Sequence, residues 1–168
     1  MKLNEFLTQH PVFTLDELDL FLAKRGTTNR MTRNSLLSYY RQKGRVVSVR
    51  RGLYSVVPIG ATPESSPVDP FLLAAKMTPD AVLAYHTALE FYGKAYSMFV
   101  RFFYISNQKS TPVRFRSYEF QCVSKPRSLQ EKEKEDFGVN KTERLGVHLK
   151  VTNLERTLVD VLDLGLLS

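Results

Sequence analysis

Positive charge is the chemical feature that stands out in this chain of 168 residues, which has a net charge of +7. Residues 1–60 contain ten lysines and arginines against four acidic residues, whereas residues 61–168 contain fourteen against thirteen. Between Asp19 and Glu64 there are nine cationic residues and no acidic one. This distribution predicts a surface that faces a polyanion, with nucleic acid as the expected partner. A solvated basic face without a specific partner is the alternative.

Residue types that catalyse reactions or bind metals are few and scattered in this sequence. It contains no glycine-rich phosphate loop, nucleophile elbow or zinc-binding helix with two histidines. We therefore expect no catalytic residue, no metal and no cofactor, and a protein that is not an enzyme. The two aspartates near the end predict the polar face of a helix, and the lone cysteine, which alternates with aromatic residues, predicts burial. The scattered candidates are His10, His86, His148, Asp160, Asp163 and Cys122.

The single cysteine and the N-terminal residues bear on the compartment. One cysteine cannot form an internal disulfide, which favours a reducing compartment. Residues 1–10 lack the apolar core of a signal peptide, and no run of residues approaches the length of a membrane span. We expect a cytoplasmic protein without a membrane partner.

The elements that would position the basic residues begin with two helices. Apolar spacing over residues 3–7 predicts a short helix, which Pro11 ends because proline cannot continue the hydrogen-bond ladder. Thr14 and Glu17 have the spacing of a capping box, so they predict the start of a second helix. Gly26 is expected to end that helix.

A third helix and a β-hairpin follow. Thr32 is expected to cap the helix, Leu36, Leu37 and Tyr40 to face inward, and Gly44 to end it. The hairpin is predicted from two β-branched or aromatic runs, residues 45–49 and 53–57, which are joined by a turn over residues 50–52 and followed by Pro58.

Three helices followed by a hairpin with arginines at its tip predict a winged helix-turn-helix over residues 1–58. Polar side chains of the third helix would reach base edges in the major groove, and cations there and at the wing tip would contact phosphates. A module that binds protein instead of DNA remains an alternative. Tyr39 is ambiguous between helix packing and the DNA backbone. The expected DNA contacts are Thr32, Arg33, Asn34, Ser35, Ser38, Tyr39, Arg41, Arg50 and Arg51.

A linker over residues 59–67, rich in proline, glycine and serine, precedes a mixed α/β unit over residues 68–168, so the fold class expected for the chain is α+β. Helices are predicted to start at Asp69-Pro70, to span His86 to Tyr92, and to follow a second capping box of Thr152 and Glu155. In this last helix Leu154, Leu158, Val161 and Leu162 form the apolar stripe. Strands are expected over Ala81 to Ala84, Phe99 to Ser106, Val113 to Val123 with a bulge near Ser117, and Val147 to Val151. Glu131 to Asp136 is predicted to be a solvated segment.

Three motifs distributed over nearly the whole chain carry a family resemblance. They are Arg50-Arg51-Gly52-Leu53-Tyr54, Tyr85-His86-Thr87-Ala88-Leu89 and Val151-Thr152-Asn153-Leu154-Glu155-Arg156-Thr157-Leu158-Val159-Asp160. Together they resemble the AbiEi family of antitoxins, which belong to type IV toxin–antitoxin systems and to phage defence by abortive infection. The resemblance implies that the winged helix represses its own operon at inverted repeats in the promoter, and that residues 68–168 counter a toxin of the nucleotidyltransferase fold.

The same resemblance leaves several features of the protein open. Members of the family usually continue past the last helix, so we expect a truncated or minimal form that retains operon repression better than antitoxicity. Direct contact with the toxin is left open, and the protein is expected to be a monomer in solution or to pair on DNA. One alternative is a winged-helix transcriptional regulator with a ligand-sensing or dimerising C-terminal domain, and another is an enzyme that acts on nucleic acid.

Overall fold

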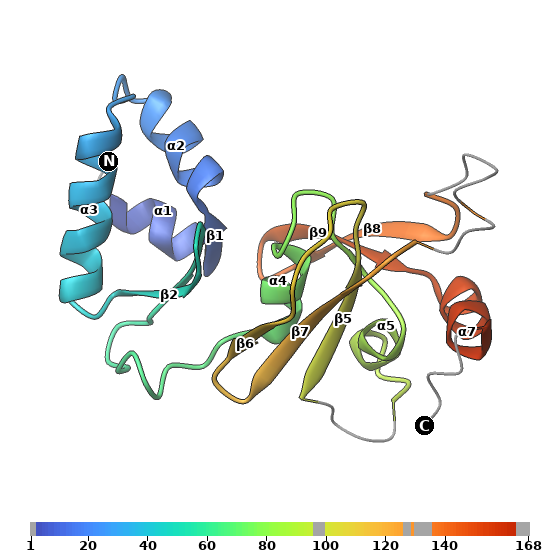
Figure 1. The fold of residues 1–168 in the computed structure, drawn as a ribbon. Helices are drawn as coiled ribbons and strands as arrows, with labels where there is room; N and C mark the ends of the chain where they lie inside the picture. The colour runs from blue at the N-terminus through green and yellow to red at the C-terminus, as the bar shows by residue number, and fades with distance from the viewer. Residues whose placement is uncertain (1–2, 96–99, 126–128, 130–135, 164–168) are drawn as a thin grey trace. The chain divides into compact units, whose positions relative to one another are not determined.

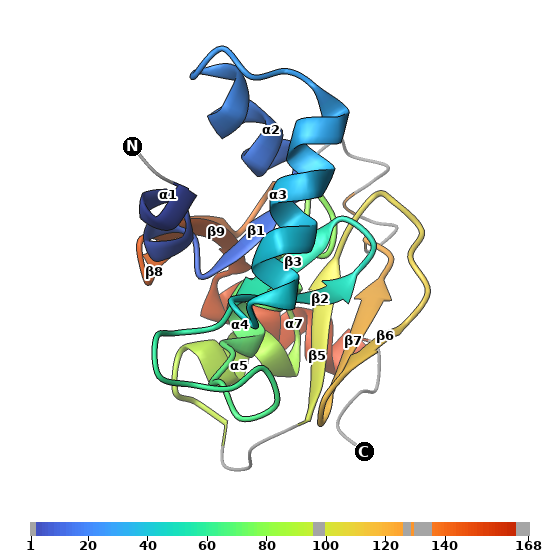
Figure 2. The same cartoon turned by 90° about the vertical axis from the view of Figure 1, so that its left-hand side faces the viewer.

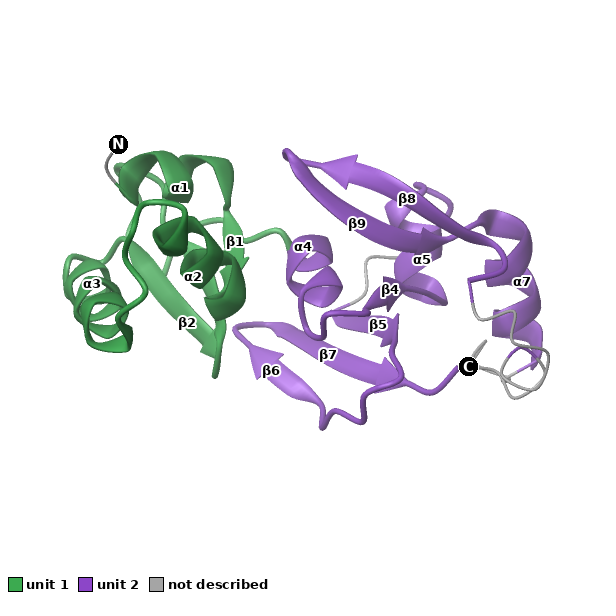
Figure 3. Ribbon diagram, turned by 90° about the horizontal axis from the view of Figure 1, so that it is seen from above, with its two compact units in different colours: residues 1–69 green, residues 70–168 purple. Residues whose placement is uncertain are grey.

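The protein combines helices and sheets in two compact units, which are described one at a time. A computed structural model describes residues 3–95, 100–125, 129 and 136–163. Unit 1 spans residues 1–69 and unit 2 spans residues 70–168 (Figure 3). The described residues form six helices and two sheets (Figure 1), so the expected mixed α+β class is confirmed.

Unit 1 contains three helices and a small antiparallel sheet (Figure 2). The sheet has the strand order β1-β3-β2. β1 was not predicted, because three residues are too short to show an alternating pattern. The elements are α1 (Leu3–Gln9), β1 (Val12–Thr14), α2 (Leu15–Ala23), α3 (Arg30–Gln42), β2 (Val46–Arg50) and β3 (Leu53–Val56).

The first capping box forms as predicted and sets the start of α2. The Glu17 backbone N–H donates to the Thr14 hydroxyl at 3.3 Å, and the Glu17 carboxylate accepts from the Thr14 backbone N–H at 2.8 Å. Gly26 follows the helix with φ +77°, a conformation that glycine adopts without strain. Because Thr14 also ends β1, the same residue joins the sheet of unit 1 to α2.

The third helix begins earlier than the sequence suggested. Asn29 is the N-cap, and its side-chain oxygen accepts from the Met31 backbone N–H at 2.8 Å. Thr32, the cap expected from the sequence, lies instead within the first turn of α3. Both residue types cap helices well, so local preference alone did not separate them. Gly44 follows the helix with φ +66°, as expected.

An apolar core holds the three helices of unit 1 to its sheet. Leu37 supplies the buried residue of α3, while Leu36 and Tyr40 are partly buried against the same cluster, in line with the predicted inward face. The buried members are Phe6, Leu7, Phe13, Leu18, Leu22, Leu37 and Val46. Since α3 contributes its apolar side chains to this core along one face, its opposite face is left to solvent.

Unit 2 is built on a mixed six-stranded sheet with the order β6-β7-β5-β4-β9-β8. β5 is parallel to β7 and β4 is parallel to β9, whereas the other neighbours are antiparallel. The elements are α4 (Pro70–Ala75), β4 (Val82–Leu83), α5 (His86–Phe91), β5 (Arg101–Ile105), β6 (Val113–Phe115), β7 (Tyr118–Val123), β8 (Val139–Arg144), β9 (Val147–Thr152) and α7 (Leu154–Asp163).

Two strand predictions for unit 2 were incomplete. The expected single strand over Val113 to Val123 is a hairpin of β6 and β7, with Arg116 at φ +55° in its turn. β8 was missed because its polar and charged side chains hide the alternating pattern of a strand at the edge of the sheet. Of the predicted solvated segment Glu131 to Asp136, residues 131–135 lie outside the described residues, as does Phe99.

Side chains of β5 alternate between two packing environments, as a pleated strand requires. Phe102 packs edge to face with Phe71 of α4, with ring centroids 5.5 Å apart. Ile105 belongs to a cluster with Tyr85, which precedes α5, and with Val161 of α7. Helices α4, α5 and α7 are therefore held to the sheet by apolar side chains.

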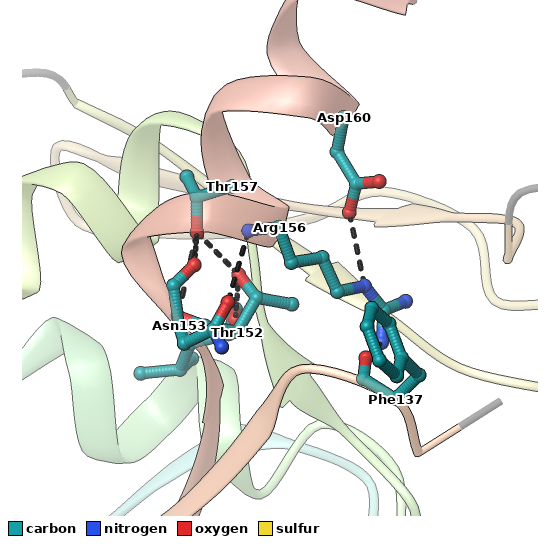
Figure 4. A network of polar contacts seen from close by, with 7 residues as sticks. Phe137, Thr152, Asn153, Arg156, Thr157 and Asp160 are labelled. Atoms are coloured by element: carbon teal, nitrogen blue, oxygen red, sulfur yellow. Dashed lines mark hydrogen bonds and ion pairs between the residues drawn. The ribbon is translucent and has the colours of Figure 1, made fainter. Parts of the chain in front are cut away.

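Polar contacts at the joint between β9 and α7 replace the second capping box that the sequence predicted (Figure 4). Thr152 is the last residue of β9, and its hydroxyl lies 2.7 Å from that of Thr157. Asn153 takes the capping position, since its side-chain oxygen accepts from the Arg156 backbone N–H at 2.9 Å. Glu155 is exposed. The capping box of Thr152 and Glu155 is therefore wrong, because Thr152 is used by the sheet and by Thr157.

A buried ion pair continues this network along the inner face of α7. Arg156 Nε lies 3.3 Å from Asp160 Oδ2, and the two side chains are only 4% and 6% exposed. Arg156 also donates to the Phe137 carbonyl at 2.6 Å (Figure 4). Burial raises the pKa of Asp160, although the neighbouring Arg156 acts in the opposite direction. Asp160 is thus buried on the inner face of α7, so the expectation that it shares a polar face with Asp163 is wrong: Asp163 is exposed, whereas Asp160 is buried because Arg156 pairs with it.

The apolar stripe predicted for α7 does not face the core as a whole. Val161 is buried, but Leu158 and Leu162 are 54% and 68% exposed, and Val159 is 64% exposed. Arg156, Thr157 and Asp160 occupy the inner face instead. The prediction failed because mutual pairing lets charged and polar residues take buried positions that hydropathy alone assigns to leucine.

Replacement of Asp160 tests whether the ion pair supports the fold. We expect Asp160→Ala to lower the free energy of unfolding by about 3–5 kcal/mol, because it leaves a buried guanidinium without its counter-charge. Asp163→Ala, on the exposed side of the same helix, is the matched control and should change it by less than about 0.5 kcal/mol. Urea denaturation measures both, and equal effects would contradict a structural role for the pair.

Tyr85 gives a second, pH-dependent test. Its ring is fully buried, its backbone has φ +56°, and its hydroxyl has no hydrogen-bond partner among the described residues. Burial, with a smaller contribution from Asp160, raises the pKa of Tyr85 from 10.0 to about 12. The pKa of Tyr85 is higher in the folded protein than in the unfolded chain. The contribution of the neutral Tyr85 side chain to the free energy of unfolding is therefore complete below pH 10 and is lost as the pH rises towards 12.

We therefore expect Tyr85→Phe to be at least as stable as the wild type at neutral pH, since it removes a buried hydroxyl without a partner. Above the pH at which an unfolded tyrosine ionises, the variant should lose less stability than the wild type. Urea denaturation across the alkaline range measures this difference. Parallel loss of stability in the two proteins would show that Tyr85 ionises as it does in the unfolded chain.

Candidate nucleic-acid interface

The exposed face of α3 is polar and has no acidic residue in any of its turns. The face centres on Met31, Ser35, Ser38 and Gln42, which lie opposite the buried Leu37. Arg30 and Arg41, which are both exposed, lie along one side of it. Small hydroxyls in the middle with cations along one margin allow close approach to a polyanion and hydrogen bonding at its centre.

Most of the side chains predicted to contact DNA are at the surface. The exposed ones are Thr32, Asn34, Ser35, Ser38, Tyr39, Arg41 and Arg51, whereas Arg33 and Arg50 are half-buried. Tyr39 is 54% exposed, its ring contacts that of Tyr40 edge to face at 5.3 Å, and Lys43 Nζ lies 5.7 Å from its centroid. The α3 members of this set therefore share one surface, with the exception of Arg33.

Arg33 is directed towards α2 instead of towards solvent. Its Nη1 atom lies 2.6 Å from Asp19 Oδ2, and its side chain is 13% exposed. Its Nε and Nη2 atoms each donate to the side-chain oxygen of Asn34 at 3.2 Å. Arg33 thus positions α3 against α2 and orients Asn34, whose amide NH2 group remains the donor for an outside partner.

The arginines of the hairpin tip have acidic residues close to them. Arg51 is exposed in the turn, where Gly52 has φ +83°. The Gly52 carbonyl accepts from the Leu15 backbone N–H at 3.0 Å, which ties the tip to the first turn of α2. That turn contains Asp16 and Glu17. We therefore expect the cations of α3 to contribute more to binding a polyanion than those of the tip.

Three exposed residues of this surface, Arg30, Met31 and Gln42, were absent from the predicted contacts. Arg30 and Met31 were missed because the helix was started at Thr32, which left both residues in the preceding connection. The signal was present in the sequence, since Asn29 is as good an N-cap residue as Thr32. Met31 is 76% exposed and places an apolar side chain at the centre of a polar face.

The histidines do not converge on a site. His10 stacks on Phe6 with ring centroids 4.2 Å apart, and its Nδ1 atom lies 3.0 Å from the Phe6 carbonyl oxygen. His86 begins α5, and His148 is exposed on β9. Within the described residues, no group of three or more histidine, cysteine or acidic side chains is arranged to hold a metal ion.

Two comparisons with known proteins found no relative of this chain. No model of a known protein family matches the chain, and a search of curated proteins found no match. Among the helices described, none has both the length and the apolar character needed to cross a membrane.

The position of the α3 cap can be tested by a pair of alanine variants. We expect Asn29→Ala to lower the free energy of unfolding by about 1 kcal/mol, because it removes the acceptor for the Met31 N–H. Thr32→Ala, an exposed change within the helix, should leave stability unchanged or raise it slightly, since alanine has the higher helix propensity. Thermal or urea unfolding measures both, and the reverse order would restore Thr32 as the cap.

Proposed function

We propose that unit 1 is a winged helix-turn-helix that binds double-stranded DNA, with α3 as the recognition helix and the β2–β3 hairpin as the wing. The order of three helices, with a short strand after the first and a hairpin after the third, supports this assignment. The observation that carries it is the exposed, acid-free face of α3. A helix of this kind fits the major groove, and flanking cations contact the phosphates.

Base recognition would come from the centre of the α3 face. Hydroxyl groups of Ser35 and Ser38 and the amide of Gln42 can donate to and accept from base edges. The Asn34 NH2 group can donate, since its oxygen is occupied by Arg33. Met31 offers an apolar contact of the kind that a thymine methyl group accepts.

Beyond DNA binding, we propose an autorepressor and antitoxin of the AbiEi type, which would counter a toxin of the nucleotidyltransferase fold. This part of the proposal rests on the three motifs that resemble that family. Arg50 to Tyr54 spans the end of β2, the hairpin tip and the start of β3, and Val151 to Asp160 forms the joint between β9 and α7. The buried side chains of this joint support a shared architecture for unit 2, while the toxin contact rests on resemblance alone.

A DNA-binding titration tests the central claim. Fluorescence anisotropy with the DNA upstream of the protein's own gene should show binding that is specific over unrelated DNA and that weakens steeply with salt. Arg30→Ala/Arg41→Ala should weaken binding, and the slope of log K against log salt should fall by about 0.9 for each phosphate that the variant no longer neutralises. Lys94→Ala/Lys141→Ala removes the same charge from exposed positions of unit 2 and is the matched control.

Two further variants separate the roles of the residues. Arg50→Ala/Arg51→Ala should have a smaller effect than the α3 pair, because the tip lies beside Asp16 and Glu17. Ser35→Ala/Ser38→Ala should reduce preference for the operator while leaving the salt slope unchanged, since hydroxyl contacts to bases release no counterions. Absence of binding at low salt, or equal weakening by the unit 2 control, would refute the proposed interface.

A further inference from the structure

A polar pocket opens in unit 2 where two neighbouring parallel strands end. β5 and β7 run side by side, with Ile105 paired to Val123, so both chains leave the sheet at the same edge. Loops that follow adjacent parallel strands border the crevices in which α/β proteins commonly bind ligands. This pocket has a volume of about 520 Å³, within the range of small-molecule sites. Its lining residues are Ser106, Asn107, Gln108, Lys109, Ser110, Cys122, Ser124 and Lys125.

The loop after β5 is held in place by a carboxylate from outside the pocket. Asp80, which precedes β4, accepts from the Ser106 hydroxyl at 2.5 Å and from the Asn107 backbone N–H at 2.7 Å. The Ser106 oxygen in turn accepts from the Gln108 N–H at 2.9 Å. Burial raises the pKa of Asp80, but these hydrogen bonds outweigh it and the net shift is downward. The loop is therefore braced by an ionised group before any ligand arrives.

The positive charge of the pocket lining indicates that its ligand is an anion. Among the described residues that line it, Lys109 and Lys125 are charged and none is acidic. Asp80, the carboxylate that braces the loop, has one oxygen bonded to Ser106 and the other to Asn107. Hydroxyl and amide groups supply the remaining polar atoms. Two ammonium groups with several hydroxyls suit an oxyanion, and lysine binds phosphate as a point charge.

We infer that this pocket binds a small organic phosphate, with Lys109 and Lys125 at the phosphate group and the serine and amide side chains around the rest of the molecule. A volume of about 520 Å³ exceeds what inorganic phosphate alone would fill, so an organic group is expected beside it. This site lies within unit 2 and does not depend on the proposed DNA binding by unit 1. It gives unit 2 a ligand of defined chemistry.

Cys122 provides a reporter inside the pocket. It is the single cysteine of the chain, it is half-buried, and its thiol lies 3.5 Å from the Gln108 carbonyl, to which it donates. Burial raises the pKa of this thiol, so alkylation is expected to be slow and sensitive to what covers it. The uncharged reagent N-ethylmaleimide avoids direct attraction to the lysines.

The experiment measures the alkylation rate of the full chain at mildly alkaline pH and constant ionic strength, with phenyl phosphate as the probe. We expect saturable protection, with the rate falling about tenfold when the probe is tenfold above its dissociation constant. Lys109→Ala should abolish protection, and Lys109→Arg should retain it. Lys141→Ala, an exposed change on β8, should protect as the wild type does. Equal alkylation rates without probe would show that the variants keep the pocket intact.

Three results would overturn the inference. One is the absence of saturable protection at constant ionic strength, and another is equal protection of the wild type and Lys109→Ala. The third is protection by duplex DNA without protection by phenyl phosphate, which would assign the two lysines to nucleic-acid phosphates. Protection by phenyl phosphate at concentrations where inorganic phosphate has little effect would support an organic ligand.

Discussion

The buried guanidinium of Arg156 is the constraint on which unit 2 depends. A charge at this depth is tolerated only when its hydrogen bonds and its counter-charge are all in place. Arg156 meets Asp160 along α7 and the Phe137 carbonyl ahead of β8, while its backbone N–H is capped by Asn153. Arg156 therefore links α7 to Phe137 ahead of β8 and to Asn153, the residue after β9.

In unit 1 most of the charged side chains of α3 are exposed, whereas the ion pair of α7 in unit 2 is buried. An ion pair between Asp19 of α2 and Arg33 of α3 turns inward an arginine that the sequence analysis had placed at the DNA-binding surface. The other cations of α3 are left exposed on a face without acidic residues. The same pairing thus holds α3 in position and orients Asn34, while Asp16 and Glu17 in the first turn of α2 lie beside the hairpin tip.

Local rules predicted much of this fold when the signal lay within a few residues. The capping box at Thr14, the hairpin after Gly44 and the mixed α+β class follow from spacing and residue type. Predictions failed where contacts between residues far apart in the sequence determine the structure. Thr152 is taken by the sheet and by Thr157, and β8 is a strand because it pairs with β9. Leu158 is exposed because an ion pair occupies the inner face.

The candidate interface was predicted in outline and altered in detail. The polar face of α3 follows from helical periodicity, but its first turn could not be placed without knowing that Asn29 is the cap. The inward turn of Arg33 depends on Asp19, fourteen residues away, and no local pattern encodes it. The DNA contacts themselves remain predictions. The phosphate pocket had no sequence signal, since its lining comes from two loops that only strand pairing brings together.

The burial of Thr152, Arg156, Thr157 and Asp160 also bears on what sequence similarity says about function. Threonine, arginine and aspartate at these spacings describe a mechanical joint between a strand and a helix. Another protein that shares only this signature would share the joint and the architecture around it. Its binding partners would have to be inferred from its exposed residues, which can differ between the two proteins.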